Sequence, residues 1–250
     1  DAFRVFSVLS GHGCEPDVVA YTCLINGLCR AGYIDEALHL KSDMRRHGVQ
    51  PNRYTFNSLI AGLCKVGKVH HTGPLLLEMV GIGGNPDTCT YNILLKAFCG
   101  LGKTHVAKQC LQAMIKKGCF PDIVTYNILI AGLCATGQDD NAFGLVSTMQ
   151  EKGISPNSVT FTCILKACGS LRLAKEGETI HAEIKKRGLL LTERNVVLGT
   201  ALVDMYSKCG LHVKAREMLD ELPIRNIVSW NALLVGYIRD GLVYEAIKCF

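Results

Sequence analysis

Three short segments carry residue types that could do chemistry, and each lacks the rest of its site. Residues 97–104 fit a relaxed phosphate-binding loop, but such a loop follows a strand, and this one is in register with helix ends at Gly67 and Gly137. His181-Ala-Glu183 matches half of a zinc deaminase signature, whose other half, Pro-Cys-x-x-Cys, is absent. His70-His71 has no Cys or His at ligand spacing. No Ser/His/Asp set stands out, so we predict no catalytic activity, cofactor or metal site.

The elements that position the polar residues follow a fixed period. Four stretches align without a gap at a spacing of 35 residues: 22–29, 57–64, 92–99 and 127–134. The same spacing links five prolines, Pro16, Pro51, Pro86, Pro121 and Pro156. A period in this range predicts a stacked array of similar units, each with an apolar face that only a neighbouring unit covers.

Each repeat predicts two helices. In the first complete repeat, apolar residues at helical spacing predict a helix from about Val19 to Cys29, which Gly32 ends. The second helix begins near Asp35, which we expect to cap it, and Gly48 stands where a helix end prefers a left-handed residue.

Two segments modify this pattern. Residues 70–74 put Gly and Pro where a second helix begins, so we expect that helix to start late, with Pro74 in its first turn. Residues 1–6 already have the pattern of an amphipathic helix, so the chain starts, and also stops, inside second helices. Because arrays normally end in capping units, we expect a fragment of a longer protein.

Composition is that of a soluble folded protein. Of 250 residues, 48% are hydrophobic and 20% charged, and no run approaches the roughly 18 apolar residues that span a bilayer. The 13 cysteines are odd in number, and four share one repeat position: Cys29, Cys64, Cys99 and Cys134. This favours small apolar core groups over disulfides or a metal site, and it implies a reducing compartment.

The repeat pattern resembles the pentatricopeptide repeat family of plant organelles. Residues 18–32 and 35–38 look like the two helices of that family, and 48–52 like its repeat end. The resemblance implies an all-α fold, a right-handed superhelical solenoid of helix-turn-helix repeats of about 35 residues over 1–250. The repeats are 1–17 (partial), 18–52, 53–87, 88–122, 123–157, a long variant 158–195, a short variant 196–226, and 227–250 (partial). The long repeat carries about three extra residues within 189–194, and the long–short succession is similar to the subfamily that includes RNA editing factors.

In this family two residues of each repeat read one RNA base: the residue after the aromatic of the first helix, and the last residue of the repeat. The corresponding pairs here are Thr22/Asn52, Asn57/Asp87, Asn92/Asp122, Asn127/Asn157, Thr162/Asn195 and Thr200/Asn226, with Asp17 and Asn231 as half-pairs. Such short polar groups suit Watson–Crick edges. The alternative is that the Asn and Asp residues only cap helices and form turns. The family's pairing implies a single-stranded RNA target resembling 5′-AUUYAA, with its 5′ end at the N-terminus of the chain.

Two further sets of residues follow from the resemblance. The second residue of each repeat sandwiches the base, and here it is Val19, Tyr54, Cys89, Val124, Val159, Val197 and Val228, of which Tyr54 and Cys89 depart from the usual Val. The alternative for these residues is ordinary core packing. Phosphate contacts are expected from Arg30, Lys65, Lys208 and Arg239, which share one repeat position; the alternative is a solvated helix surface. With a net charge of +5, about four phosphate contacts would give a log–log salt slope near −3.

These observations together favour sequence-specific binding of single-stranded RNA in organelle RNA processing (editing, splicing, stability or translation). The resemblance places the protein in the mitochondrion or chloroplast, with other RNA-processing proteins as further partners and with no membrane or small-molecule substrate. The main alternative is a protein-binding solenoid, a scaffold subunit of an organelle ribosome or transcription complex. Such a scaffold need not keep polar pairs in consecutive repeats.

Overall fold

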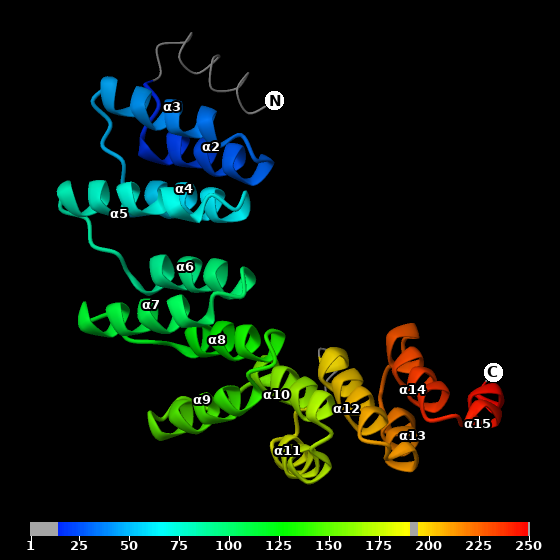
Figure 1. The fold of residues 1–250 in the computed structure, drawn as a ribbon. Coiled ribbons are helices and arrows are strands. Elements are labelled where there is room, and N and C mark those ends of the chain that lie inside the picture. The colour runs from blue at the N-terminus through cyan, green and yellow to red at the C-terminus, as the bar shows by residue number, and fades with distance from the viewer. Residues whose placement is uncertain (1–14, 191–194, 250) are drawn as a thin grey trace. The chain divides into compact units, whose positions relative to one another are not determined.

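The computed structural model describes residues 15–190 and 195–249, and every regular element within these ranges is a helix (Figure 1). The chain folds into two compact units, residues 1–125 and 126–250. The first contains α2 (Val18–Ala31), α3 (Ile34–Arg46), α4 (Arg53–Lys65), the short 3-10 helix η1 (Val69–His71), α5 (Thr72–Gly81), α6 (Thr88–Gly100) and α7 (Thr104–Lys116). Helix α8 (Ile123–Ala135) runs from the first unit into the second. The second unit continues with α9 (Asp139–Glu151), α10 (Ser158–Leu171), α11 (Ala174–Lys186), α12 (Val196–Lys208), α13 (His212–Glu221), α14 (Ile227–Arg239) and α15 (Val243–Lys248).

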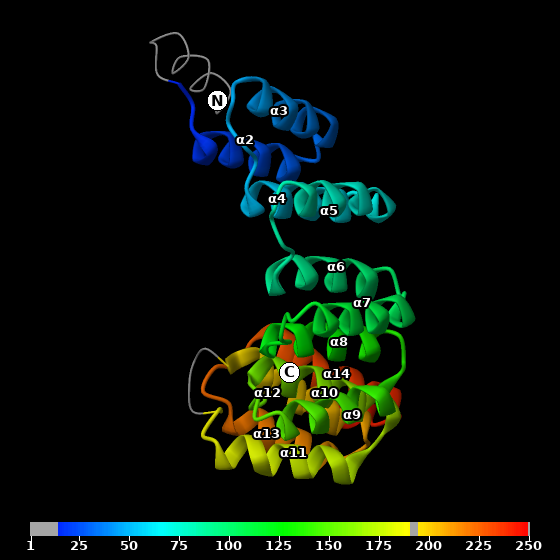
Figure 2. The same cartoon turned by 90° about the vertical axis from the view of Figure 1, so that its left-hand side faces the viewer.

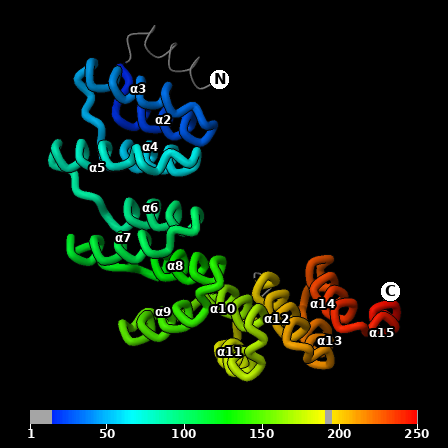
Figure 3. Tube along the Cα trace, viewed as in Figure 1, coloured from blue at the N-terminus to red at the C-terminus, as the bar shows by residue number. Residues whose placement is uncertain are grey.

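Within each unit the helices pair along the chain, and the pairs stack. In the first unit α2 pairs with α3, α4 with α5 and α6 with α7, and the first helices α2, α4 and α6 contact one another in succession (Figures 1 and 2). In the second unit the first helices α10, α12 and α14 do the same, and the tube in Figure 3 follows the chain through their partners α11, α13 and α15. The predicted all-α class of stacked helix pairs is therefore confirmed. The helix expected over residues 1–6 lies outside the described residues, and so do residues 191–194 of the segment 189–194 that carries the extra residues of the long repeat.

Local sequence signals explain most helix ends. Helix α2 begins at Val18 and stops before Gly32, whose φ of +93° is the left-handed conformation expected at a helix end, and Gly48 has a φ of +76° after α3. Helix α5 begins late, after η1, with Pro74 in its first turn, as predicted.

One predicted cap is wrong. Asp35 does not cap α3; it lies in the first turn, and the capping residue is Tyr33, whose side chain makes no cap hydrogen bond. A carboxylate in the first turn still interacts favourably with the positive end of the helix dipole, which explains why the sequence signal looks like a cap.

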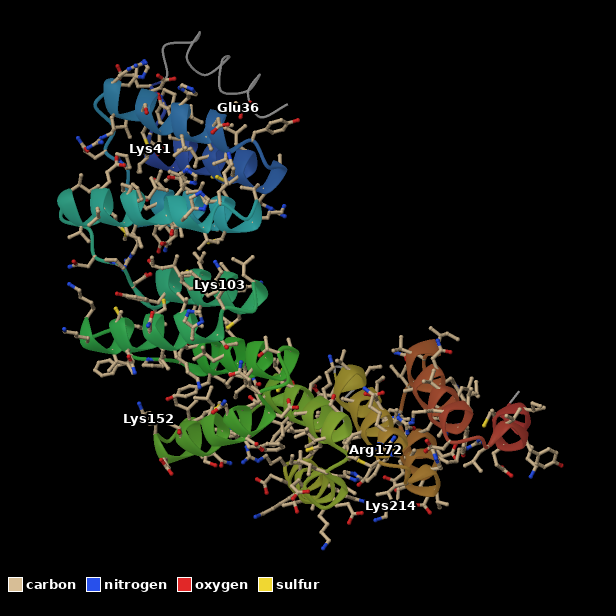
Figure 4. The ribbon with its side chains drawn as sticks, viewed as in Figure 1. Glu36, Lys41, Lys103, Lys152, Arg172 and Lys214 are labelled. Carbon is tan, nitrogen blue, oxygen red and sulfur yellow. The ribbon has the colours of Figure 1, made fainter. Side chains whose placement is uncertain are left out.

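The cores lie between successive helix pairs. Met44, Met79, Met114 and Met149, which share one repeat position, are all fully buried. Ion pairs link second helices of successive repeats: buried Lys41 on α3 lies 2.5 Å from Glu78 on α5, and exposed Lys214 on α13 lies 2.6 Å from Glu178 on α11. Figure 4 labels both lysines. The exposed pair contributes about 0–1 kcal/mol, and apolar burial is the main force that stacks the helix pairs.

Candidate nucleic-acid interface

The last residue of most repeats caps the first helix of the next repeat. An oxygen of the capping side chain accepts the backbone N–H three residues further on, over 2.8–3.1 Å, and this holds for Asp17, Asn52, Asp87, Asp122, Asn157 and Asn226. These six residues therefore do cap helices. Base reading stays a prediction, and it is compatible with capping because the cap occupies only one atom of each side chain.

The other member of three pairs lies beside its cap. Asn92 Nδ2 donates to Asp122 Oδ1 over 3.3 Å, and Asn127 Nδ2 donates to Asn157 Oδ1 over 3.2 Å. Asn57 and Asp87 are joined through Thr90, whose hydroxyl lies 2.7 Å from Asn57 Oδ1 and 2.9 Å from Asp87 Oδ1. The fold therefore brings these paired residues together, although they are 30 residues apart in the sequence.

The remaining pairs are arranged differently. The Thr22 hydroxyl lies 2.8 Å from the hydroxyl of Thr55, next to the cap Asn52. Thr162 and Thr200 instead donate their hydroxyl protons to carbonyls of their own helices, four residues back. Asn195 precedes α12 without a side-chain cap bond and donates to the Leu189 carbonyl. The half-pair residue Asn231 is exposed on α14.

The predicted base-sandwiching residues are on the surface. The six Val and Tyr residues at this position are 50–68% exposed, and Cys89 is exposed as well. Ordinary core packing is therefore wrong for them. Helical residues in a first turn that keep large apolar side chains in solvent offer a contact surface for another flat apolar group.

A groove of about 340 Å³ combines both sets of residues on α2, α4 and α6. Its walls include Tyr54 and Cys89 from the predicted sandwich positions, and Thr22 and Asn57 from the predicted reading positions. A polar amide thus lies in a cleft with an aromatic ring and a thiol on its walls. This arrangement suits a planar heterocycle, which stacks on its faces and forms hydrogen bonds at its edge.

The two carboxylate caps are held ionised. Burial opposes the charge of Asp87, but hydrogen bonds from Thr90, the charge of Arg53 and a hydrogen bond from Asn57 outweigh it and lower the pKa. The pKa of Asp122 is also lowered: burial opposes the charge, but hydrogen bonds from Thr125 and Asn92 outweigh it. At neutral pH both side chains can therefore accept hydrogen bonds but cannot donate them.

Three of the four predicted phosphate contacts have partners within the protein. Lys65 donates to the Arg30 carbonyl at the end of the preceding first helix over 2.6 Å, and Arg239 donates to the Ser207 carbonyl over 2.6 Å. Lys208 pairs with Asp204 over 2.7 Å, while the Arg30 side chain is exposed. Cations that neutralise the carbonyl end of a helix stabilise the stack. Phosphate contact by these residues stays a prediction.

Two kinds of residue at the candidate interface were missed in the sequence. The threonines three residues after each cap, Thr55, Thr90, Thr125 and Thr160, are fully buried and bond both the cap and the preceding repeat. Their recurrence at a spacing of 35 residues was the available signal, but a capping box is usually recognised by Glu or Gln there. Arg53, 3.2 Å from Asp87 Oδ2, carried no signal because no other repeat has a cation at its first position.

The other candidate chemistry finds no support in the described ranges. Lys103 lies between two helices, not after a strand, and His181 lies within α11, where it bonds the hydroxyl of Tyr206 over 2.8 Å. In the described part of the chain, no three His, Cys, Asp or Glu side chains gather as metal ligands do, and no helix has the length and apolarity to cross a bilayer. Cys29 and Cys99 are buried and Cys64 and Cys134 half-buried, as small core groups would be.

Comparison with known proteins gives a consistent picture. The model of the PPR repeat family matches residues 16–65, 86–135 and 121–170, and a PPR repeat model matches 54–83, 159–189, 200–227 and 228–250. Two chloroplastic pentatricopeptide repeat-containing proteins of Arabidopsis thaliana are each 44% identical over 87 residues, which are 35% of this chain and 10% and 16% of those proteins. The chain thus matches only a small part of these relatives.

Solved structures of similar fold include RNA complexes. The maize pentatricopeptide repeat protein PPR10, solved in complex with an 18-nt psaJ RNA element, matches with a TM-score of 0.61 and 25% identity over 94% of this chain and 38% of that chain. The PPR domain of protein-only RNase P 1 from Arabidopsis thaliana, solved in complex with tRNA, matches in fold with a TM-score of 0.53 and 18% identity, over 68% of this chain and 90% of that one.

Proposed function

The chain belongs to the pentatricopeptide repeat family, and from this premise we propose that it binds single-stranded RNA, with one base read by each repeat from residue 18 to residue 157. The observation that carries the proposal is the recurrence of a polar pair held beside exposed apolar side chains. The clearest case is Asn92 with Asp122, next to Val124. The solved complex of PPR10 with RNA, at 25% identity, supports RNA as the ligand class.

The hydrogen-bonding atoms explain the base that each pair would select. Asp122 uses Oδ1 for its cap and for Asn92, which leaves Oδ2 as an acceptor without a partner among the described residues. A carboxylate beside N3 of a pyrimidine favours uracil, whose N3 carries a proton, over cytosine, whose N3 is an acceptor. Asn92/Asp122 therefore reads uracil in this proposal. For Asn57/Asp87 the choice of uracil rests on the family's pairing, because Oδ2 of Asp87 is ion-paired with Arg53 over 3.2 Å.

The pair Asn127/Asn157 offers a different edge. Asn157 Oδ1 already accepts the backbone N–H groups of Val159 and Thr160, so its remaining group is the amide NH2, a donor. An amide N–H can donate to N3 of cytosine and also to a carbonyl of uracil. This pair would therefore accept either pyrimidine. With Thr22/Asn52 as an adenine reader, the expected core is 5′-A-U-U-Y-3′.

The biological setting follows from the relatives. The chloroplastic names of two curated relatives support action in an organelle, as one segment of a longer RNA-processing protein. We propose a non-catalytic role for this segment: it blocks, remodels or delivers an RNA whose editing, splicing, stability or translation depends on binding.

The test uses labelled RNA with a 5′-AUUYAA core in unrelated flanks, compared with the same RNA carrying a changed AUUY core, at several salt concentrations. The sharpest variant is Asp122→Asn, because Asn caps a helix about as well as Asp while it replaces an acceptor by a donor. The parent chain should prefer uracil over cytosine at the third base by about tenfold, the order of one hydrogen bond to a charged group. Asp122→Asn should lose that preference and keep its thermal stability.

Other outcomes have clear meanings. Equal and steeply salt-dependent binding of both RNAs would show an electrostatic groove without base reading. An absence of binding at low salt would refute RNA recognition and favour the protein-binding scaffold.

A further inference from the structure

In three repeats the orientation of the reading asparagine depends on a hydroxyl that belongs to the next repeat. Thr90 Oγ1 lies 2.7 Å from Asn57 Oδ1, Thr125 Oγ1 lies 2.7 Å from Asn92 Oδ1, and Thr160 Oγ1 lies 2.6 Å from Asn127 Oδ1. We propose that these threonines are positioning residues that fix which amide atom a repeat presents to its base. The proposal rests on the RNA-reading function proposed above.

The threonine hydroxyl is part of a directed chain of hydrogen bonds. It accepts the backbone N–H of the capping residue, over 3.2 Å in both Asp87 and Asp122, so its proton points away from that group. A carbonyl or carboxylate oxygen is the only kind of partner left for that proton, since neither can donate. The nearest such atom is the amide oxygen of the preceding reading Asn.

The capping residue fixes the amide of the reading Asn from the other side, and we call these two hydrogen bonds together the lock. Asp122 Oδ1 must be an acceptor because it takes the Thr125 backbone N–H at 2.8 Å, and Asn92 therefore turns its NH2 toward it. The amide of Asn92 is held with oxygen toward Thr125 and nitrogen toward Asp122, and a flip by 180° would place N–H against a donor and oxygen against a carboxylate. One N–H of Asn92 then remains for the base, always as a donor.

The lock requires burial, which all three threonines have. Thr90, Thr125 and Thr160 are 0% exposed, so water does not replace a lost hydroxyl. In such a setting an unmade hydrogen bond is costly, and a correctly made one holds a single orientation.

The same geometry separates the repeats into two groups. Leu198 stands where a threonine is needed to hold Thr162, and Thr162 instead donates to the Ser158 carbonyl over 2.7 Å. Ser229 occupies the position after Thr200, yet its hydroxyl donates to the Asn226 carbonyl, and Thr200 donates to Val196. Repeats 158–195 and 196–226 therefore lack the lock. They bind RNA without selecting a base, which reduces the specific target from six bases to the four of the core.

The test is Thr125→Val, which removes the hydroxyl and keeps the shape. Dissociation constants are measured for RNAs with each base in turn at the second, third and fifth positions of the core. We expect the uracil preference at the third base to fall from about tenfold to less than threefold, while the preference at the second base, read by Asn57, is unchanged in the same protein. Thr125→Ser restores the third-base preference because it restores the hydroxyl.

A matched control separates orientation from capping. Ser229→Ala removes a fully buried hydroxyl from the same capping position, but this hydroxyl bonds only the backbone of Asn226 and holds no reading side chain of the four-base core. It should lower thermal stability about as much as Thr125→Val does and leave every base preference intact.

If Thr125→Val keeps its third-base preference, or if Ser229→Ala loses base preferences too, the threonine is only a cap and the proposal is overturned. A strong preference at the fifth base would overturn the division between repeats, whereas a parent chain without any base preference would refute the RNA-reading function itself.

Discussion

Replacement of Gly62 by alanine should separate two helices on which the groove depends. Gly62 lies on α4 and faces α2 and α3. A Cβ built there would lie 2.7 Å from both Cβ and Sγ of Cys29 and 2.8 Å from Cδ1 of Ile34. Such separations are well below van der Waals contact, and Cβ of Cys29 cannot rotate away. Overpacking of this kind costs typically 1–3 kcal/mol, and the better helix propensity of alanine returns up to about 1 kcal/mol.

The expected net loss for Gly62→Ala is therefore about 1–2 kcal/mol, which is roughly 2–8 °C in melting temperature for a chain of this size. Because α2 and α4 carry Thr22 and Asn57 on the walls of the groove, we also expect weaker binding of RNA at the first two bases, with the third unaffected. The assays are thermal unfolding followed by circular dichroism and the RNA titrations described above.

Two companion variants make the reasoning specific. Gly144→Ala, in the interior of α9, meets no described atom within 4 Å and should stabilise the chain by about 0.5–1 kcal/mol through helix propensity alone. The next repeat accommodates Ala97 at the position of Gly62 and has Val69 at the position of Ile34. Ile34→Val removes the Cδ1 atom, so it should recover part of the loss when combined with Gly62→Ala. If Gly62→Ala is as stable as the parent, or if Ile34→Val only adds to the loss, the packing argument is refuted.

Three further predictions concern charges and thiols. The folded-state pKa of Asp122 is lowered, so ionised Asp122 stabilises the fold above the unfolded pKa of about 3.9, and this contribution is lost as the pH falls through the folded pKa. Between pH 6 and pH 2.5 the melting temperature of the parent should therefore fall further than that of Asp122→Asn. Equal falls would contradict this reasoning. Exposed Cys89 should react with N-ethylmaleimide in the native chain, and the cognate RNA should protect it. Cys29 is buried, and burial raises its pKa to about 11, so it should react only in urea. Peptide mass mapping distinguishes the two modified cysteines. Lys65→Met should lower stability by about 0.5–1 kcal/mol through loss of the bond to the Arg30 carbonyl and leave the salt slope of RNA binding almost unchanged; a slope shallower by about 1 would show that Lys65 contacts a phosphate instead.

The sequence predicted the helix pairs and most of their ends because these depend on residues close together in the chain. Gly32 and Pro74 act within one turn of their own helix, and the capping role of Asn and Asp was recognised as an alternative for the same reason. The period then extended each local prediction to the other repeats. Asp35 shows the limit of such signals, since an acidic first turn and a cap look alike in sequence.

Only the tertiary structure decided which atoms of the polar residues remain for a ligand. Asn92 and Thr162 occupy equivalent positions in the sequence, yet Asn92 is held by Thr125 while Thr162 bonds its own helix. Lys65 looks like a surface cation in the sequence, but its ammonium group donates a hydrogen bond to the carbonyl of Arg30, 35 residues away. A hydrogen bond has a direction and a short reach, so the partner that fixes it is set by how one repeat packs on the next, which the residue types within a single repeat do not specify.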